Sequence, residues 1–466
     1  MTNTGRGPDA ESARRAAAAT AGLGEWVSGL DAADVPRPVL DRLSLVLLNV
    51  AGVTAVGAAL DEQAALRASW RAPDGPAPLI GAGRRVPADA AAWLNAAALV
   101  CLELDEGNKY AKGHPAAHGF PAVLALAAEL DAAGADTAAA LLAAYETASR
   151  FGRASRLRPG AHPHGNWGVA GAAAGCARLL GLGPEATAAA IDTGAGLPVA
   201  GHFASATDGN PVRDAWMGAS NTSGLVAARM AAAGAARNTG TAALSLGGLL
   251  GGFDPSELTG ALGTRWDVTR GYFKRHASCS FTHPAADAVL GLRDGLDPSR
   301  ITGIAVETHA LGAGLASAEW DNRLSAMFSQ PFVIAAAVLE GEVGPRVLER
   351  RDDPALRSLA RRVRLVAAGD LTARLPDERA ARVTVELDDG TVRTREVPNP
   401  VGDADHRPLD ERDVLTLLEG WLPGREELIG RAAAFARDLP ALDRVGERLR
   451  ELAGTGVRPS GREEPN

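Results

Sequence analysis

Lysine is rare in this chain, and the few positions that keep it point to chemistry. Lysine and arginine together number 48, but only three of these residues are lysines: Lys109, Lys112 and Lys274. Arginine stays charged and presents a rigid fork, whereas lysine is a compact ammonium whose pKa shifts when it is buried. If arginine replaces lysine wherever charge alone matters, these three remain as candidates for proton transfer or for close contact with an anion.

Histidines gather near the lysines in stretches marked by glycine and proline. Four stretches stand out: "DEGNKYAKGHPAAH" (105–118), "RPGAHPHGNWG" (158–168), "DGNPVRDAWMGASN" (208–221) and "YFKRHASCSFTHP" (272–284). They hold six of the nine histidines, namely His114, His118, His162, His164, His276 and His283. A pocket built from these stretches would be positively charged and able to move protons, so its natural ligand is a small di- or tricarboxylate. The natural reaction is removal of a proton next to a carboxylate, while cations stabilise the enolate-like charge.

Each stretch also has a simpler explanation when it is taken alone. The first could be a polar loop that caps the next helix, and the second a turn before a helix. Arg213 in the third could clamp a carboxylate or form a surface ion pair. The fourth lies where the sequence texture changes, at an expected domain boundary, and such boundaries favour small-molecule sites.

A metal site is not expected from the pattern. His114 and His118 are four residues apart, but the zinc motif that uses this spacing needs glutamate after the first histidine, and Pro115 stands there. Cys101, Cys176 and Cys279 are isolated, which argues against a local zinc or iron–sulfur motif and fits a reducing cytoplasm.

The composition indicates a globular chain with 466 residues, 46% hydrophobic and 22% charged. The net charge is −8 and no basic cluster stands out, so we expect no nucleic-acid partner. The most apolar stretch, 43–60, is close to membrane-spanning length. We expect it to form a buried pair of helices broken at Gly52, and we expect no membrane association.

The pattern of elements predicts a mainly α fold with two domains. Helical periodicity covers 21–268 and 401–453, and one of these helices is expected to open near Pro121. An α/β domain is expected over 269–400, with a strand at 301–311, a hairpin at 381–398 turning at Asp389-Gly390, and helices at 330–341 and 353–366. The α/β domain would be an insertion, because the late helices rejoin the first domain. Residues 1–20 and 454–466 are expected to be flexible.

Five segments together resemble the MmgE/PrpD family, which includes 2-methylcitrate dehydratase, cis-aconitate decarboxylase and iminodisuccinate epimerase. The segments are "LELDEGNKYAKGHPAAHGFPAVLALAAE", "GAHPHGNWGVAGAAAGCARLLGL", "VRDAWMGASNTSGLVAARMAAAG", "FKRHASCSFTHPAADAV" and "FSQPFVIAAAV". The resemblance implies a homodimer with a large all-helical domain and a smaller α/β lid domain. It also implies an active site between them that uses neither a metal nor an organic cofactor.

The resemblance also implies site residues. The acidic loop of the family falls on Glu103, Asp105 and Glu106, and its histidines and lid lysine fall on His114, His162, Lys274 and His283. Three positions depart from the decarboxylase-like pattern. Arg213 replaces a lysine, Phe332 replaces a tyrosine, and a threonine is replaced around Gly107 and Asn108. The lost tyrosine hydroxyl argues against cis-aconitate decarboxylation.

We therefore predict a carbon–oxygen lyase of the 2-methylcitrate dehydratase type, acting on a hydroxylated di- or tricarboxylate. Predicted catalytic residues are Lys274, His114, His162 and Asp105. Predicted substrate-binding residues are Arg213, Glu103, Asn108, Lys109, Lys112, His164, His276, His283 and Phe332. Epimerisation and decarboxylation of a small polycarboxylate remain alternatives within the same fold. An alternative of another class is a dimeric binding or scaffold protein that has lost catalysis.

Overall fold

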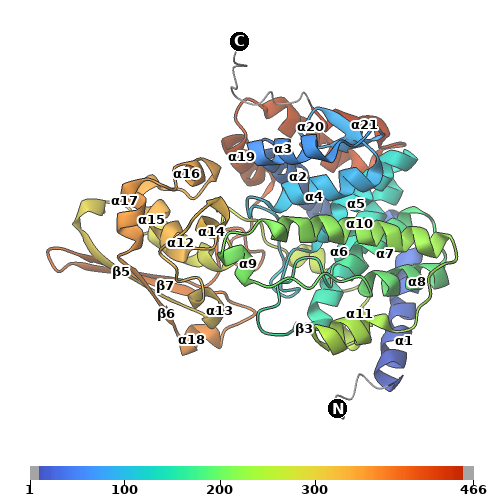
Figure 1. Cartoon of the computed structure of the whole chain (residues 1–466), viewed down its shortest axis with the longest axis horizontal. Coiled ribbons are helices and arrows are strands. Elements are labelled where there is room, and N and C mark those ends of the chain that lie inside the picture. The colour runs from blue at the N-terminus through green and yellow to red at the C-terminus, as the bar shows by residue number, and fades with distance from the viewer. Residues whose placement is uncertain (1–9, 455–466) are drawn as a thin grey trace.

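The chain folds into a helical region and a smaller α/β region that lie side by side, as a computed structural model of residues 10–454 shows (Figure 1). The longer helices of the helical region are α1 (Ala10–Ser28), α2 (Arg37–Ala58), α3 (Asp61–Trp70), α4 (Ala88–Val100), α5 (Pro115–Leu130), α6 (Gly134–Ala154), α7 (Val169–Leu179), α8 (Pro184–Ala195) and α10 (Val212–Ala232). Its short elements are β1 (Ala77–Leu79), β2 (Arg84–Val86), β3 (Ser155–Leu157), α9 (Ala204–Thr207), β4 (Gly251–Phe253) and α11 (Ser256–Thr259).

Small residues let the central helices approach closely, as the glycine- and alanine-rich sequence predicts. Helix α7 packs against α6, α8 and α10. A Cβ at Gly171 of α7 would lie 2.6 Å from the carbonyl oxygen of Ala144 in α6. A Cβ at Gly224 of α10 would lie 2.2 Å from the Cβ of Ala172. Larger residues at these positions would push the helices apart and open voids in the core.

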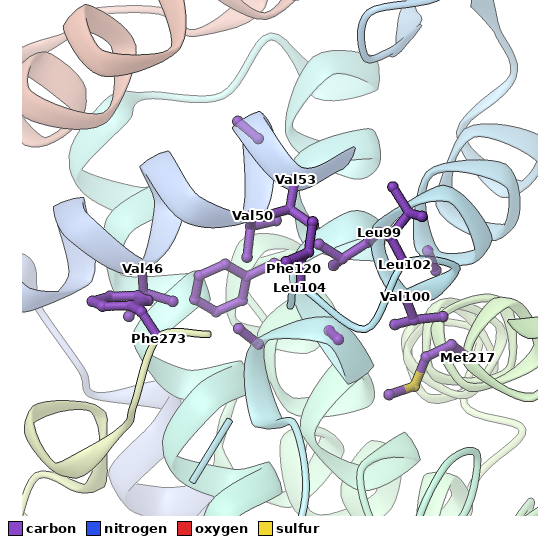
Figure 2. Close-up of a cluster of buried hydrophobic side chains, with 14 of the residues drawn as sticks. Val46, Val50, Val53, Leu99, Val100, Leu102, Leu104, Phe120, Met217 and Phe273 are labelled. Carbon is purple, nitrogen blue, oxygen red and sulfur yellow. The ribbon is translucent and has the colours of Figure 1, made fainter. Parts of the chain in front are cut away.

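Helix α2 is one unbroken helix, so the expected break at Gly52 is wrong. By length and composition it could cross a membrane, but 72% of its apolar window is buried against the rest of the protein. Gly52 serves packing instead, since a Cβ there would lie 2.4 Å from Leu418. Figure 2 shows Val46, Val50 and Val53 of α2 in a buried cluster with Phe120 of α5.

Helix α5 begins at Pro115, earlier than expected, and Pro121 lies inside it. A proline lacks an N–H and disturbs the hydrogen bonds of its turn. Asn221 of α10 repairs this turn: its Nδ2 donates to the carbonyl of Ala117 (2.9 Å), and its Oδ1 accepts from the N–H of Ala122 (3.0 Å). One side chain thus satisfies the groups that Pro121 leaves open, and α5 continues.

The α/β region contains a four-stranded sheet in the order β6-β5-β7-β8. Strands β5 and β6 are parallel, and the other neighbouring pairs are antiparallel. The strands are β5 (Ile301–Thr308), β6 (Val363–Ala367), β7 (Ala381–Leu387) and β8 (Val392–Val397). The helices are α12 (His283–Leu290), α13 (Ala310–Ala313), α14 (Arg323–Met327), α15 (Gln330–Glu340), α16 (Pro345–Glu349), α17 (Pro354–Ala360) and α18 (Gly369–Thr372).

The predicted strand at 301–311, hairpin at 381–398 and helix at 330–341 correspond to observed elements. Gly390 turns the hairpin with φ of 82°. The predicted helix at 353–366 is wrong in its second half, because α17 ends at Ala360 and Val363–Ala367 forms strand β6. The alternation of β6 was too short to separate from the helical pattern that precedes it.

The chain returns to the helical region after the sheet. Helices α19 (Glu411–Trp421) and α20 (Glu426–Asp438) pack against α2, and α21 (Gly446–Glu451) packs against α5. In Figure 1 these red helices lie beside the blue ones.

The flexible arm expected over residues 1–20 is wrong for residues 10–20. These residues belong to α1, where Ala16 and Thr20 are buried and the helix packs against α8. Residues 1–9 lie outside the described part of the chain, as does the expected C-terminal tail apart from Gly454.

Candidate active site

A cavity of about 380 Å³ lies between the helical region and the α/β region. Three of the four stretches singled out in the sequence contribute to it, and the stretch around Arg213 does not. From the helical region the lining residues are Glu103, Lys109, Lys112, Gly113, His114, His162, Pro163, His164 and Phe203. From the later part of the chain they are Tyr272, Cys279, Ser280, Phe281, Leu311, Phe328, Leu375, Pro376 and Arg379.

The loop between α4 and α5 carries the acidic residues and His114 in a strained backbone. Glu103 has φ of 53° and Lys112 has φ of 61°, left-handed values that residues other than glycine seldom adopt. Each such residue costs on the order of 1–3 kcal/mol, and such strain concentrates at functional sites. Both residues line the cavity.

Gly107 ties this loop to the segment that leads into the α/β region. Its N–H donates to the carbonyl of Tyr272 (3.0 Å), and the N–H of Tyr272 donates back (2.7 Å). A Cβ at Gly107 would lie 2.4 Å from the Tyr272 hydroxyl oxygen. Glycine at this position therefore makes room for the tyrosine ring that lines the cavity.

Asn108 shapes the loop rather than the cavity surface. Its Oδ1 accepts from the N–H groups of Tyr110 and Ala111, and its Nδ2 donates to the carbonyl of Asp267 (2.9 Å). All of its hydrogen bonds are made within the protein, and it does not line the cavity.

His114 is the N-cap residue of α5 and lines the cavity. Its Nδ1 donates to the carbonyl oxygen of Glu106 (2.7 Å) and lies 3.0 Å from Oδ2 of Asp105. Because both neighbours are acceptors, Nδ1 carries a proton, and a neutral ring keeps its lone pair on Nε2. Within residues 10–454 no hydrogen bond occupies that Nε2. His114 is thus oriented as a proton acceptor.

The pKa values of two buried carboxyl groups behind His114 are shifted in opposite directions. Burial alone would raise the pKa of Asp105, but the charges of His114 and Lys274 hold it well below the usual carboxyl range. Burial raises the pKa of Glu106 to about 7, although a hydrogen bond from the Tyr145 hydroxyl (2.5 Å) opposes this effect. Asp105 therefore supplies the negative charge that stabilises a protonated His114.

His162 and His164 lie in the loop before α7, and their rings pack edge-on with centroids 4.4 Å apart. The Nδ1 of His162 accepts the N–H of His164 (3.1 Å), so the proton of a neutral His162 ring sits on Nε2. Burial, followed by the charge of Arg213, lowers the pKa of His162 well below its usual value. Burial and the neighbouring His162 lower the pKa of His164 in the same way. Both rings are neutral near pH 7 and act as hydrogen-bond donors.

Lys274 and Arg213 lie behind the cavity wall, where both pair with Glu103. Lys274 Nζ is 2.8 Å from Oε2 of Glu103 and 3.4 Å from Oδ1 of Asp105. Arg213 is 2.5 Å from Oε1 of Glu103 and also pairs with Asp214. Both cations are fully buried, and neither lines the cavity.

Proton exchange by Lys274 is disfavoured in this environment. Burial would lower the pKa of Lys274, but Asp105 and Glu103 raise it above its usual value. The role of substrate clamp expected for Arg213 meets a similar obstacle, because Glu103 and Asp214 already occupy its guanidinium. In this structure the two cations hold Glu103 and Asp105 in place.

Arg379, between α18 and β7, is the cavity cation that the sequence did not single out. Its guanidinium donates to the Ser280 hydroxyl (3.1 Å) and lies 5.1 Å from the centroid of the Tyr272 ring. No carboxylate of residues 10–454 lies within ion-pair distance of it. It can therefore bind a carboxylate without breaking an existing ion pair.

Lys109 and Lys112 both line the cavity but differ in their partners. Lys109 Nζ pairs with Asp403 (3.2 Å) and Asp405 (3.0 Å). Lys112 Nζ donates to the backbone carbonyl of Ser155 (2.6 Å) and has no carboxylate partner in the described part of the chain. Lys112 is the more available of the two for an anion.

Besides Asn108 and Arg213, three more predicted substrate-binding residues lie away from the cavity surface. His276 Nε2 pairs with Asp287 (3.0 Å), and His283 Nε2 contacts the carbonyl of Ser278 (3.1 Å). Phe332 is fully buried and packs against Trp320, with ring centroids 5.0 Å apart. The structure gives these residues roles in packing and local hydrogen bonding.

Sequence reasoning missed most of the α/β side of the cavity, including Arg379 and its apolar residues. Tyr272 is one of three tyrosines and lies two residues before Lys274, a signal that was visible in the sequence although Tyr272 was not among the predicted site residues. Among residues 10–454, no group of three or more histidine, cysteine, aspartate or glutamate side chains is arranged to hold a metal ion.

Family models match both parts of the chain and define its class. The MmgE/PrpD N-terminal domain matches residues 21–245, and the MmgE/PrpD C-terminal domain matches residues 276–417. The chain belongs to the MmgE/PrpD family, as the sequence motifs predicted. The family includes enzymes such as dehydratases and cis-aconitate decarboxylase.

Curated relatives of the chain are described as decarboxylases or decarboxylase-like. The chain is 32% identical over 298 residues to the cis-aconitate decarboxylase-like protein oryM of Aspergillus oryzae, covering 59% of this chain and 61% of that protein. It is 25% identical over 419 residues to cis-aconitate decarboxylase of Aspergillus terreus, covering 82% of this chain and 85% of the relative. The match thus spans less than two thirds of the first protein and most of the second.

Proposed function

We propose that the chain is a hydro-lyase that removes water from a hydroxylated di- or tricarboxylate, with His114 as the base. The observation that carries the proposal is the environment of His114. Its Nδ1 is held by the Glu106 carbonyl and by Asp105, its Nε2 has no hydrogen-bond partner among residues 10–454, and the residue lines the cavity. A histidine held in this way is suited to general base catalysis.

Arg379 would bind the carboxylate next to the reacting carbon. Its guanidinium lines the cavity without a carboxylate partner among residues 10–454. Removing a proton next to a carboxylate places a second negative charge on that group. A guanidinium in a largely buried cavity stabilises such charge far better than water does. Lys112 could neutralise a second carboxylate.

The reaction then proceeds in two steps that balance. The Nε2 lone pair of His114 takes the proton from the carbon next to the carboxylate, and the C–H electron pair forms an enolate-like anion. That electron pair then makes the C=C bond as the C–O bond to the neighbouring hydroxyl breaks. The His114 imidazolium returns its proton to the departing hydroxide, which leaves as water. Asp105 stabilises the imidazolium between the two steps.

His162 and His164 would orient the substrate through hydrogen bonds. The Nδ1 of His162 accepts the backbone N–H of His164, and the Nδ1 of His164 accepts from the Arg213 guanidinium (3.4 Å), so both neutral rings carry their proton on Nε2. Proton donation from either ring would leave an unfavourable imidazolate. Neutral imidazole donors can polarise oxygen atoms without giving up the proton.

Decarboxylation is the second candidate, because the named relatives are cis-aconitate decarboxylase and a decarboxylase-like protein. In that reaction His114 first takes a proton from solvent. A C–C bond then breaks, carbon dioxide leaves, the electron pair of that bond stays on the carbon, and this carbon takes the proton from the His114 imidazolium. The argument against decarboxylation from Phe332 loses its basis, since Phe332 does not line the cavity. Tyr272 is the tyrosine that lines the cavity.

One experiment separates the candidates. Citrate, 2-methylcitrate and cis-aconitate are incubated with the protein in deuterated buffer, and deuterium uptake, double-bond absorbance and carbon dioxide release are measured. A hydro-lyase forms the double bond without carbon dioxide, and a decarboxylase releases it. His114→Asn should lower turnover about a hundredfold or more.

The matched control is His406→Asn, because His406 is exposed and lies outside the cavity. It should leave turnover unchanged. If the wild-type protein binds these acids but exchanges no α-hydrogen and forms no product, the enzyme proposal is wrong. The binding or scaffold alternative then holds.

A further inference from the structure

One wall of the cavity is apolar to a degree that a small polycarboxylate does not require. We define the apolar wall as seven cavity-lining side chains: Pro163, Phe203, Phe281, Leu311, Phe328, Leu375 and Pro376. Five of these belong to the later part of the chain. A carboxylate buried against such side chains would lose hydration without gaining a partner, which is costly.

The apolar wall begins directly beside the histidines. Phe203 stacks on the ring of His162, with centroids 5.3 Å apart and an angle of 22° between the planes. Phe328 packs edge-on against Phe203, with centroids 5.8 Å apart. A substrate whose reacting carbon faces the histidines would therefore carry its apolar group close to that carbon, where the group can lie on the apolar wall.

The unpaired cations of the cavity are few. Lys112 and Arg379 line it without a carboxylate partner in residues 10–454, whereas Lys109 is neutralised by Asp403 and Asp405. Two cations match two carboxylates. The part of the substrate beyond the two carboxylates must then be apolar, so that it can pack against the apolar wall.

The apolar wall also reaches the protein surface. Leu311 lines the cavity although 58% of it is exposed. A chain that runs along the wall from the histidines could leave the cavity at this point. The wall therefore sets no sharp upper limit on chain length.

We propose that the substrate is a dicarboxylate-bearing acid with an unbranched hydrocarbon chain, which lies along the apolar wall while Arg379 and Lys112 bind the carboxylates. This inference rests on the proposed function, because it assigns the substrate class of the same site. The substrate-class proposal concerns binding alone, whereas the proposed function concerns the reaction. Either proposal can therefore fail while the other holds.

The test uses succinate and its 2-methyl, 2-propyl, 2-pentyl and 2-octyl derivatives as probes, with dissociation constants measured by calorimetry below the concentrations at which the longer acids aggregate. Each methylene that leaves water for the wall should tighten binding about fourfold, as expected from ~0.8 kcal/mol per methylene. The gain should level off once the chain passes Leu311, without a loss of affinity for the octyl derivative.

Phe281→Ser should reduce the gain per methylene, since Phe281 is a partly exposed member of the wall. Its affinity for succinate, which has no side chain to lie on the wall, is the baseline, because Arg379 also lies 5.5 Å from the Phe281 ring centroid. The matched control is Leu249→Ser, because Leu249 is 73% exposed and lies outside the cavity. The control should keep the wild-type slope.

Affinity that stays flat or falls with chain length would overturn the proposal, as would an equal slope in Phe281→Ser and the wild type. These measurements need no turnover. A rising series with no α-hydrogen exchange by any tested acid sinks the proposed reaction but upholds the substrate class. If affinity does not change with chain length but α-hydrogen exchange is observed, the proposed reaction holds and the substrate class is wrong.

Discussion

The two sides of the cavity differ in the kinds of side chain that form them and in how those side chains are paired. On the helical side, charged and polar residues are tied into a buried network, in which Glu103 pairs with Arg213 and Lys274, and Asp105 lies beside His114. On the α/β side, apolar side chains line the cavity together with Arg379, which has no carboxylate partner among the described residues. The difference separates two tasks: the helical side fixes groups that can react, and the α/β side leaves contacts free for a ligand.

The largest expected effect concerns a cation of the buried network. Lys274→Met should lower the free energy of unfolding by about 3–5 kcal/mol, because it leaves Glu103 and Asp105 buried with less positive charge. Chemical denaturation measures this change. Lys112→Met is the control, since Lys112 is exposed and has no carboxylate partner within residues 10–454, and its effect should stay within about 0.5 kcal/mol. Unchanged stability of Lys274→Met with lost turnover would instead support the proton exchange expected from the sequence.

The second effect tests whether the network serves the reaction. Asp105→Asn removes the charge beside His114 while keeping the shape of the side chain, so an imidazolium becomes less favourable. Turnover should fall about a hundredfold, with little change in the affinity for 2-methylsuccinate. Measuring the rate across pH adds a readout that a purely structural role would not move. If turnover stays within a few-fold of wild type at every pH, His114 does not depend on Asp105.

The smallest effect concerns the α/β side. Arg379→Ala should weaken binding of 2-methylsuccinate about tenfold or more, the scale of one charge-assisted hydrogen bond. Stability should change little, because no ion pair to a carboxylate of residues 10–454 is broken. Arg364→Ala is the control, as Arg364 is exposed on β6 outside the cavity. If Arg379→Ala loses much stability but keeps its affinity for 2-methylsuccinate, Arg379 serves the fold rather than ligand binding, and the proposed difference between the two sides is wrong.

The sequence predicted the mainly helical architecture, the α/β region and the histidines of the helical side because their signals are local. The Asp389-Gly390 turn and the glycine-rich helices are read from neighbouring residues. The histidines at 114, 162 and 164 stood out by type and line the cavity together.

The features of the site that the sequence did not predict depend on contacts between residues that are distant in the sequence. Lys274 and Glu103 are 171 positions apart, so their ion pair, which disfavours proton exchange by Lys274, could not be read from either stretch. Arg379 is one arginine among many, and only the structure shows that it lines the cavity without a carboxylate partner among residues 10–454. The apolar wall combines residues from six separate segments, none of which is unusual alone.

The contact between Gly107 and Tyr272 has a consequence for exchange of parts between relatives. Two backbone hydrogen bonds join these residues across the two halves of the chain, and a single added carbon at position 107 would collide with the tyrosine hydroxyl. The residues at positions 107 and 272 must therefore be compatible with each other in any one protein. A chimera that takes its first half from a relative with a larger residue at position 107 must also change position 272, or the loop that holds the base will shift.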